Sequence, residues 1–213
     1  MSYLENILYS LPGLVAGFTI HEFFHAFMAY CLGDNTAKEQ GRLTLNPLKH
    51  LDKLGFLLLV LTGFGWAKPV FFDEDSLKHP RRDKALIALA GPVSNFALAV
   101  LILTGVRFLD TAGGARFLLA HFSRVAIQRI FLFLITFAAV NIGIGAFNLI
   151  PIPPLDGSRI FLSGFDVDRE TEQKFLRTGG IMLIGLLMLE RLAGIRILRV
   201  EWVVGGLIRL ILR

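Results

Sequence analysis

Two histidines and a glutamate stand together inside a strongly apolar stretch near the start of the chain. The sequence His-Glu-Phe-Phe-His at residues 21–25 lies within an apolar run over residues 7–32. On a helix, His21 and His25 are four residues apart and share one face, so both imidazoles can reach a single zinc ion. Glu22 lies one step around the helix and can act as general base on a water at that zinc. This spacing predicts one Zn²⁺ per chain, with Glu22 as a catalytic residue.

The apolar surroundings make this cluster more informative than its spacing alone. A charged residue in the hydrocarbon of a bilayer costs at least about 2.5 kcal/mol, and such residues usually mark functional sites. The position of His21, Glu22 and His25 therefore indicates hydrolytic chemistry inside a membrane.

A third zinc ligand is expected at Asp156. A catalytic zinc has three protein ligands and one open position, so two histidines are not enough. Three prolines at residues 151–154 must break the preceding apolar segment. Irregular backbone at membrane depth is tolerated only where protein or a wet cavity satisfies its polar groups, so the carboxylate of Asp156 can face inward. The alternative is that Asp156 and Gly157 form an ordinary turn at a helix start.

Two amide side chains accompany these groups. Asn148 can donate a hydrogen bond to a developing oxyanion or hold a substrate carbonyl, and we predict it as a catalytic residue. The alternative is that it caps the broken helix. Asn95 lies in another apolar segment and is expected to join helices or to support the site rather than to catalyse.

The composition indicates an all-α polytopic membrane protein. Of the 213 residues, 54% are hydrophobic, and the mean hydropathy is +0.61. Several apolar runs approach the roughly 20 residues that cross hydrocarbon as a helix. Four transmembrane helices are predicted, at about residues 7–32, 85–106, 126–149 and 179–192.

A shorter apolar stretch is predicted to be a re-entrant or interfacial segment, and the alternative is that it crosses the membrane. Residues 54–66 as a helix would cover about 20 Å, which is less than a hydrocarbon core of about 30 Å. A re-entrant or hairpin segment is therefore expected near residues 41–66. Residues 41–47 are expected to be extended and to end in a turn at Pro47. The segment 41–66 is expected to offer an edge strand to an unwound substrate. His50 is expected to be solvated.

The distribution of Lys and Arg predicts an orientation. Residues 34–84 contain nine of them, residues 107–125 contain three, and residues 1–37 contain none. The positive-inside rule then places residues 34–84, and the nearer face of the zinc site, at the cytoplasm. The net charge of +5 is interpreted as topology and contact with the lipid bilayer, because no basic stripe interleaved with aromatics indicates nucleic-acid binding. Residues 196–213 are expected to form an amphipathic tail at the membrane surface.

Taken together, these stretches resemble the site-2 protease family of intramembrane zinc metalloproteases. The resemblance rests on the His-Glu-x-x-His pattern and on four further motifs in the same order. These are Gly-Arg-Leu-Thr-Leu-Asn-Pro at 41–47, Gly-Trp-Ala-Lys-Pro at 65–69, Ala-Gly-Pro-Val-Ser-Asn at 90–95, and the stretch at 148–157. It implies that His21, His25 and Asp156 bind zinc and that Glu22 is the general base.

The resemblance also implies a substrate class and a location. It predicts cleavage within or near the transmembrane segments of other membrane proteins, as in regulated intramembrane proteolysis, in a bacterial inner membrane. Residues 1–157 are predicted to be the protease core, and residues 158–213 a loop, a further membrane helix and the tail. No stretch is long enough for an inserted PDZ domain, and no CBS-like domain is expected after the core.

Two other functions remain open from the sequence. One is a catalytically silent membrane scaffold that binds zinc, and the other is a transporter whose buried charges form an ion pathway. The sequence has fewer spans than a transporter needs and shows no inverted repeat, and both observations disfavour the transporter. Assembly into a homo-oligomer is left open.

Overall fold

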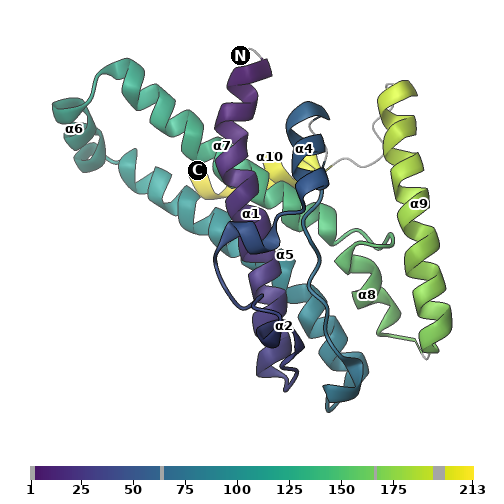
Figure 1. The fold of residues 1–213 in the computed structure, drawn as a ribbon. Helices are drawn as coiled ribbons and strands as arrows, with labels where there is room; N and C mark the ends of the chain where they lie inside the picture. The colour runs from purple at the N-terminus through teal and green to yellow at the C-terminus, as the bar shows by residue number, and fades with distance from the viewer. Residues whose placement is uncertain (1–2, 63–64, 166, 194–199) are drawn as a thin grey trace.

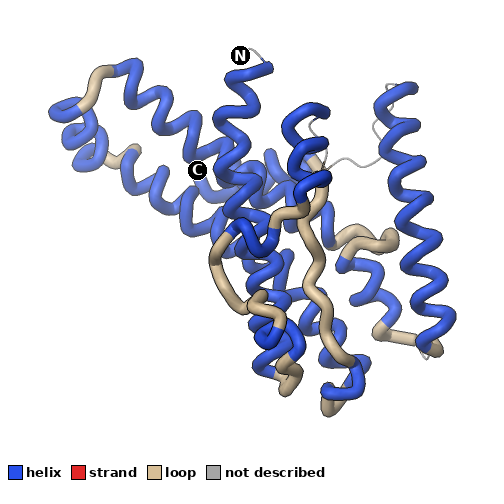
Figure 2. The backbone as a smooth tube through the Cα atoms, viewed as in Figure 1, coloured by secondary structure: helices blue, strands red, loops and turns tan. Residues whose placement is uncertain are grey.

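The computed structural model describes residues 3–62, 65–165, 167–193 and 200–213, and all regular secondary structure in them is helical (Figure 2). The prediction of an all-α polytopic membrane protein is confirmed. In chain order the helices are α1 (Tyr3–Cys31), α2 (Thr36–Glu39), α3 (Pro47–His50), α4 (Lys53–Thr62), the 3₁₀ turn η1 (Glu74–Ser76), α5 (Pro80–Leu109), α6 (Ala112–His121), α7 (Arg124–Asn148), α8 (Asp156–Leu162), α9 (Arg169–Ala193) and α10 (Glu201–Leu212).

Three of the described helices are long and apolar enough to cross a membrane, namely α1, α5 and α7. They correspond to the first three predicted spans, although α1 and α7 each end one residue earlier than predicted. The fourth predicted span lies in α9, which is helical but is not one of these three. The first three turns of α9 are strongly charged, from Arg169 to Arg177, and this shortens its apolar part. By length and composition, the described residues therefore provide three spans rather than four.

The three long helices pack directly against one another. Figure 1 shows α5 and α7 as a pair joined by α6, with α1 crossing them. Small residues permit this close packing. A Cβ atom on Gly17 of α1 would lie 2.6 Å from the Ile144 side chain of α7 and 2.9 Å from the amide oxygen of Asn141. Large apolar side chains such as Phe27 of α1 and Leu101 of α5 remain exposed on the outer faces, as expected where helices face lipid.

The C-terminal helix α10 also belongs to this bundle. Its apolar residues, Val204, Leu207 and Ile208 among them, pack on a buried cluster formed by α5 and α7. Arg107 of α5 donates a hydrogen bond to the carbonyl of Ile211 at 3.1 Å. The predicted amphipathic helix is present, but it rests on other helices of the bundle. Residues 196–199 of the predicted tail lie outside the described residues.

The region near residues 41–66 folds back on itself, as the hairpin prediction requires. The ten-residue α4 covers about 15 Å and cannot span the membrane. After it, residues 65–73, here called the return segment, run back without helix (Figure 2). The amide of Lys68 donates to the carbonyl of His50 at 2.7 Å, and Leu51 and Ala67 form an antiparallel bridge. Residues 63–64 of this predicted segment lie outside the described residues.

The stretch at 41–47 ends where Pro47 starts α3, and the Asn46 side chain caps that helix by accepting from the amide of Leu48. No strand is assigned there within the described residues, and an edge strand offered to a substrate stays a prediction. One prediction for this region is wrong. His50 is not solvated, since its side chain is completely buried beneath the return segment.

Helix α9 stands beside the bundle and contacts it through a few specific points (Figure 1). Lys84 of α5 pairs with Glu172 of α9 at 2.6 Å. Farther along α9, a Cβ atom on Gly179 would lie 2.2 Å from the Pro153 side chain, so the helix packs closely on the proline-rich loop. That loop leads directly into α8. The predicted boundary after residue 157 falls in the first turn of α8 and stays a prediction.

Candidate active site

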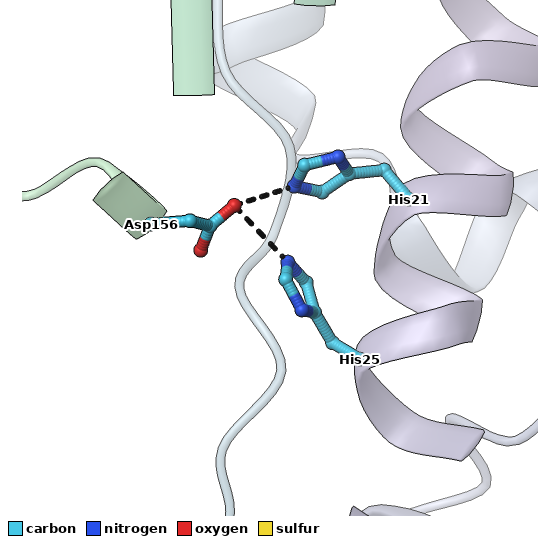
Figure 3. Close-up of side chains that lie close together, drawn as sticks. All are labelled: His21, His25 and Asp156. Atoms are coloured by element: carbon cyan, nitrogen blue, oxygen red, sulfur yellow. Dashed lines mark hydrogen bonds and ion pairs between the residues drawn. The ribbon is translucent and has the colours of Figure 1, made fainter. Parts of the chain in front are cut away.

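His21, His25 and Asp156 come together from two distant parts of the chain. Both imidazoles project from one face of α1 toward the carboxylate of Asp156, which is the first residue of α8 (Figure 3). The Oδ2 atom of Asp156 lies 3.0 Å from Nε2 of His21 and 3.3 Å from Nε2 of His25. The potential ligand atoms of the three residues all lie within 4.8 Å of one another.

The opposite nitrogen of each imidazole is held by a hydrogen-bond acceptor. Nδ1 of His21 lies 2.7 Å from the side-chain oxygen of Asn95, and Nδ1 of His25 lies 2.7 Å from the carbonyl of Ile87. Each Nδ1 must therefore be the protonated nitrogen that donates. In neutral imidazoles this leaves both Nε2 lone pairs facing Asp156, which is the arrangement that metal-ligating histidines use.

The orientation of the Asn95 amide is fixed by a third helix. Its Nδ2 donates to the carbonyl of Gly17 at 3.0 Å and to the side-chain oxygen of Asn141 on α7 at 3.1 Å. Asn141 donates in turn to the carbonyls of Gly13 and Phe137. A buried chain of hydrogen bonds thus runs from α7 through α5 to His21. Sequence reasoning missed Asn141, although its position seven residues before Asn148 puts both amides on one helix face.

These three residues fit a zinc ion. Ligand atoms about 2.1 Å from a tetrahedral zinc lie about 3.4 Å apart, close to the two distances from the Asp156 oxygen. Two unprotonated nitrogens and a carboxylate oxygen also repel one another unless a cation or a proton lies between them. Two imidazoles and one carboxylate form a ligand set found in catalytic zinc sites.

Two glycines allow the ligands to approach one another. A Cβ atom on Gly91 of α5 would lie 2.5 Å from Nε2 of His25 and 2.7 Å from Nε2 of His21. A Cβ atom on Gly157 would lie 2.2 Å from the carbonyl oxygen of Leu149. Gly91 thus keeps α5 clear of the imidazoles, and Gly157 lets the start of α8 pack against the end of α7.

Glu22 is buried beside the two histidines. Its Oε2 accepts a hydrogen bond from the amide of Val70 at 2.9 Å and lies 4.0 Å from the Nη2 atom of Arg42. The carboxylate therefore has a fixed position, next to the ligands but on a neighbouring face of α1. Arg42 was noted in the sequence only as part of a motif.

All five predicted site residues line one cavity of about 150 Å³. Asn148, the last residue of α7, reaches it with a side chain whose Nδ2 also donates to the carbonyl of Ile144 at 2.9 Å. The other residues that line the cavity are Pro69, Val70, Phe72, Ile87, Ala88, Pro154 and Arg159. A polar cavity of this size has room for water next to Glu22.

The sequence profile of peptidase family M50 matches residues 9–189, a range that includes every residue described above as part of the site. The chain belongs to peptidase family M50. The resemblance to the site-2 proteases is thereby confirmed. Together with three apolar helices long enough to span, membership in M50 makes this chain an integral membrane protein of a zinc metalloprotease family.

Relatives of this M50 chain are found in several organisms. The candidate zinc metalloprotease YwhC of Bacillus subtilis is 43% identical over 157 residues, which cover 74% of this chain and 69% of YwhC. The candidate zinc metalloprotease Rip2 of Mycolicibacterium smegmatis is 33% identical over 163 residues, 74% of this chain and 57% of Rip2. The chain therefore spans little more than half of the mycobacterial relative. No solved structure matches it significantly.

Proposed function

We propose that this M50 chain is an intramembrane zinc endopeptidase that cleaves peptide bonds within or near the transmembrane segments of other membrane proteins. The observation that supports this most is the convergence of His21, His25 and Asp156 beside a buried Glu22, inside helices that can span a bilayer. A carboxylate next to two imidazoles, in a cavity with room for water, suits peptide hydrolysis.

His21, His25 and Asp156 would hold the zinc, which when bound supplies Lewis-acid polarisation of the scissile carbonyl and activation of a water. Glu22 accepts a proton from the attacking water and returns it to the leaving amine. Its hydrogen bond from the amide of Val70 uses Oε2, so Oε1 can take part in this transfer. Asn95 and the carbonyl of Ile87 keep both imidazoles oriented while the charge at the site changes.

Asn148 has the chemistry to stabilise the oxyanion that forms when the carbonyl is attacked. One of its amide hydrogens is occupied by the carbonyl of Ile144, and the second can point into the cavity. Its place at the end of α7, before the loop that leads to Asp156, puts this donor near the ligands. This supports the catalytic role predicted for Asn148.

The proposed substrate is a transmembrane protein whose helix unwinds locally, because a helix conceals its carbonyls in its own hydrogen bonds. The charge pattern supports a site nearer the cytoplasmic face. Residues 34–84, with nine Lys or Arg, join the C-terminal end of α1 to the start of α5, and Figure 1 shows α2 and the start of α5 at the same end of the bundle. A relative in Bacillus supports the bacterial inner membrane as the location.

The test is the substitution Glu22→Gln, with Glu170→Gln as a control at an exposed position on α9. Each purified protein is incubated with detergent-solubilised membranes from cells that lack it, and new N-termini within transmembrane segments are measured by mass spectrometry. We expect wild type and Glu170→Gln to generate the same termini. The Glu22→Gln variant should generate at least about 1,000-fold fewer while retaining one zinc per chain. Equal cleavage by Glu22→Gln would overturn the proposal.

The same variant separates the proposal from a silent scaffold. A scaffold depends on bound zinc rather than on a base, so Glu22→Gln would leave its cellular phenotype intact. Loss of that phenotype with zinc retained supports the protease.

A further inference from the structure

Arg42 is a cation buried next to the proposed catalytic base. Only 4% of its surface is exposed, and its Nη2 atom lies 4.0 Å from Oε2 of Glu22. It is the second residue of the Gly-Arg-Leu-Thr-Leu-Asn-Pro motif, and neither zinc binding nor the proton transfers above use it. Its position therefore needs a separate explanation.

The guanidinium joins two segments that are separate in sequence. Nη1 of Arg42 donates to the carbonyl of Lys49 in α3 at 2.6 Å, and Nη2 donates to the carbonyl of Lys68 in the return segment. Because the planar fork of arginine has fixed donor directions, it can hold two acceptors at a defined separation. Arg42 thus fixes the return segment relative to α3.

The return segment in turn contacts the base. The amide of Val70, two residues after Lys68, donates to Oε2 of Glu22 at 2.9 Å. Pro69, Val70 and Phe72 also form one wall of the cavity. Arg42 therefore contacts the same segment that lines the cavity and donates a hydrogen bond to Glu22.

Stability alone is a poor explanation for this cation. Burying a guanidinium is costly even when it is paired. Within the described residues, the buried Nε atom of Arg42 has no hydrogen-bond partner, which adds to that cost. An apolar side chain of similar volume would fill the same space at lower cost, but it could not hold two carbonyls and a carboxylate.

We infer that Arg42 is a positioning residue of the proposed reaction, which clamps the return segment so that Val70 and the cavity wall hold Glu22 in its working orientation. The inference rests on the proposed peptidase function for its effect on turnover. The clamp itself is a property of the folded chain.

The test compares Arg42→Gln and Arg42→Lys with two matched controls, Lys49→Ala and Lys68→Ala. The control substitutions remove exposed side chains but leave the carbonyls that Arg42 contacts. Hydrogen exchange of the peptide spanning residues 66–72 is measured for each protein, together with zinc content. The kcat and KM values are measured on a peptide that the wild type cleaves.

We expect Arg42→Gln to increase exchange at residues 66–72 about 10-fold and to lower kcat by about 10- to 100-fold, because small displacements of catalytic groups have effects of this size. The KM value should change by less than about 3-fold, and zinc should stay at one per chain. Arg42→Lys keeps the charge and one donor group but loses the planar fork, so it should recover part of kcat. Both lysine variants should match wild type.

Wild-type exchange and wild-type kcat in Arg42→Gln would overturn the inference. The inference would also be overturned if Lys49→Ala or Lys68→Ala were as impaired as Arg42→Gln and both that control and Arg42→Gln had lost zinc. That result indicates general unfolding. If the wild type cleaves nothing, or Glu22→Gln cleaves as well as wild type, it is the proposed function that fails. The exchange measurement still tests the clamp in that case.

Discussion

The side chains of Asn95 and Asn141 form a hydrogen bond of 3.1 Å between α5 and α7. This bond orients the Asn95 amide, whose oxygen accepts a hydrogen bond from Nδ1 of His21. Both asparagines are completely buried. A buried amide that lacks its partners costs about 1–3 kcal/mol, so the pair constrains how the three long helices pack. The orientation of a proposed metal ligand on α1 thus depends on a residue of α7 that does not touch it.

This relationship predicts a role for Asn95 in zinc affinity. Replacing Asn95 with Ala removes the acceptor for Nδ1 of His21, so the imidazole loses its fixed tautomer and direction. We expect zinc affinity to fall about 10- to 100-fold in competition with a chelator. Ser94→Ala is the matched control, because the Ser94 hydroxyl donates to the carbonyl of Gly91 in its own helix. Equal zinc affinity of Asn95→Ala and wild type would contradict the role of Asn95.

Gly91 and Gly105 give a second matched pair within α5. A Cβ atom at Gly91 would collide with both imidazoles, whereas one at Gly105 would meet nothing within 4 Å. Gly91→Ala should therefore lose most of its zinc and its activity. Gly105→Ala should keep both and gain up to about 1 kcal/mol of stability from helix propensity. Metal analysis and thermal unfolding in detergent check this, and full zinc binding by Gly91→Ala would show that the helices separate more easily than the structure indicates.

Asn148 is predicted to act in the transition state rather than in substrate binding. If its free amide hydrogen stabilises the oxyanion, Asn148→Ala should lower kcat about 100-fold with little change in KM or zinc content. Ser163→Ala is the control, because that hydroxyl bonds only to the carbonyl of Ile160. An Asn148→Ala variant with wild-type kcat would leave Asn148 as no more than the last residue of α7.

His50 predicts a pH dependence of stability. Burial lowers the pKa of the His50 imidazole below its usual 6.5, and the positive charge of Arg42 lowers this pKa further. Above about pH 6.5 the His50 imidazole is neutral in both the folded and the unfolded chain. Its protonation then does not reduce the free energy of unfolding. As the pH falls below 6.5, the unfolded chain binds a proton there that the folded chain does not, so the free energy of unfolding decreases.

The substitution His50→Gln tests this sign. Glutamine can still donate to the carbonyl of Thr44, the partner of Nε2 in His50. Between pH 7.5 and 5.5, the Tm of His50→Gln should fall less than that of wild type, whereas a His121→Gln control at an exposed position should behave as wild type. A steeper fall for His50→Gln would show that the folded state takes up the proton more readily than the unfolded one.

Local periodicity explains why so much of the site could be predicted. His21 and His25 share a helix face whatever the rest of the chain does, and three prolines force a break wherever the third long helix ends. Asp156 was found because the chemistry of zinc required a third ligand and the proline-rich loop offered a carboxylate. The three long helices followed from apolar length alone.

The remaining features depend on contacts between distant segments. His50 and Arg42 read as loop residues, and they are buried only because residues 50–51 pair with residues 67–68 after α4. Asn141 was overlooked because a lone amide in an apolar helix does not reveal which neighbour it meets. The apolar part of α9 suggested a span, but the charged residues in its first turns make the apolar part short. The helix lies beside the bundle, which it contacts at Gly179 and through the Lys84–Glu172 pair.

We propose that His21, His25 and Asp156 form one zinc site, and the zinc content per chain is the decisive measurement. Zinc is measured by mass spectrometry in wild type and in Asp156→Ala after both have been equilibrated with the same buffered free zinc. We expect one zinc per wild-type chain and far less in Asp156→Ala at the same free zinc. If the folded wild type holds no zinc, or if Asp156→Ala binds zinc as tightly as wild type, these three residues do not form a zinc site.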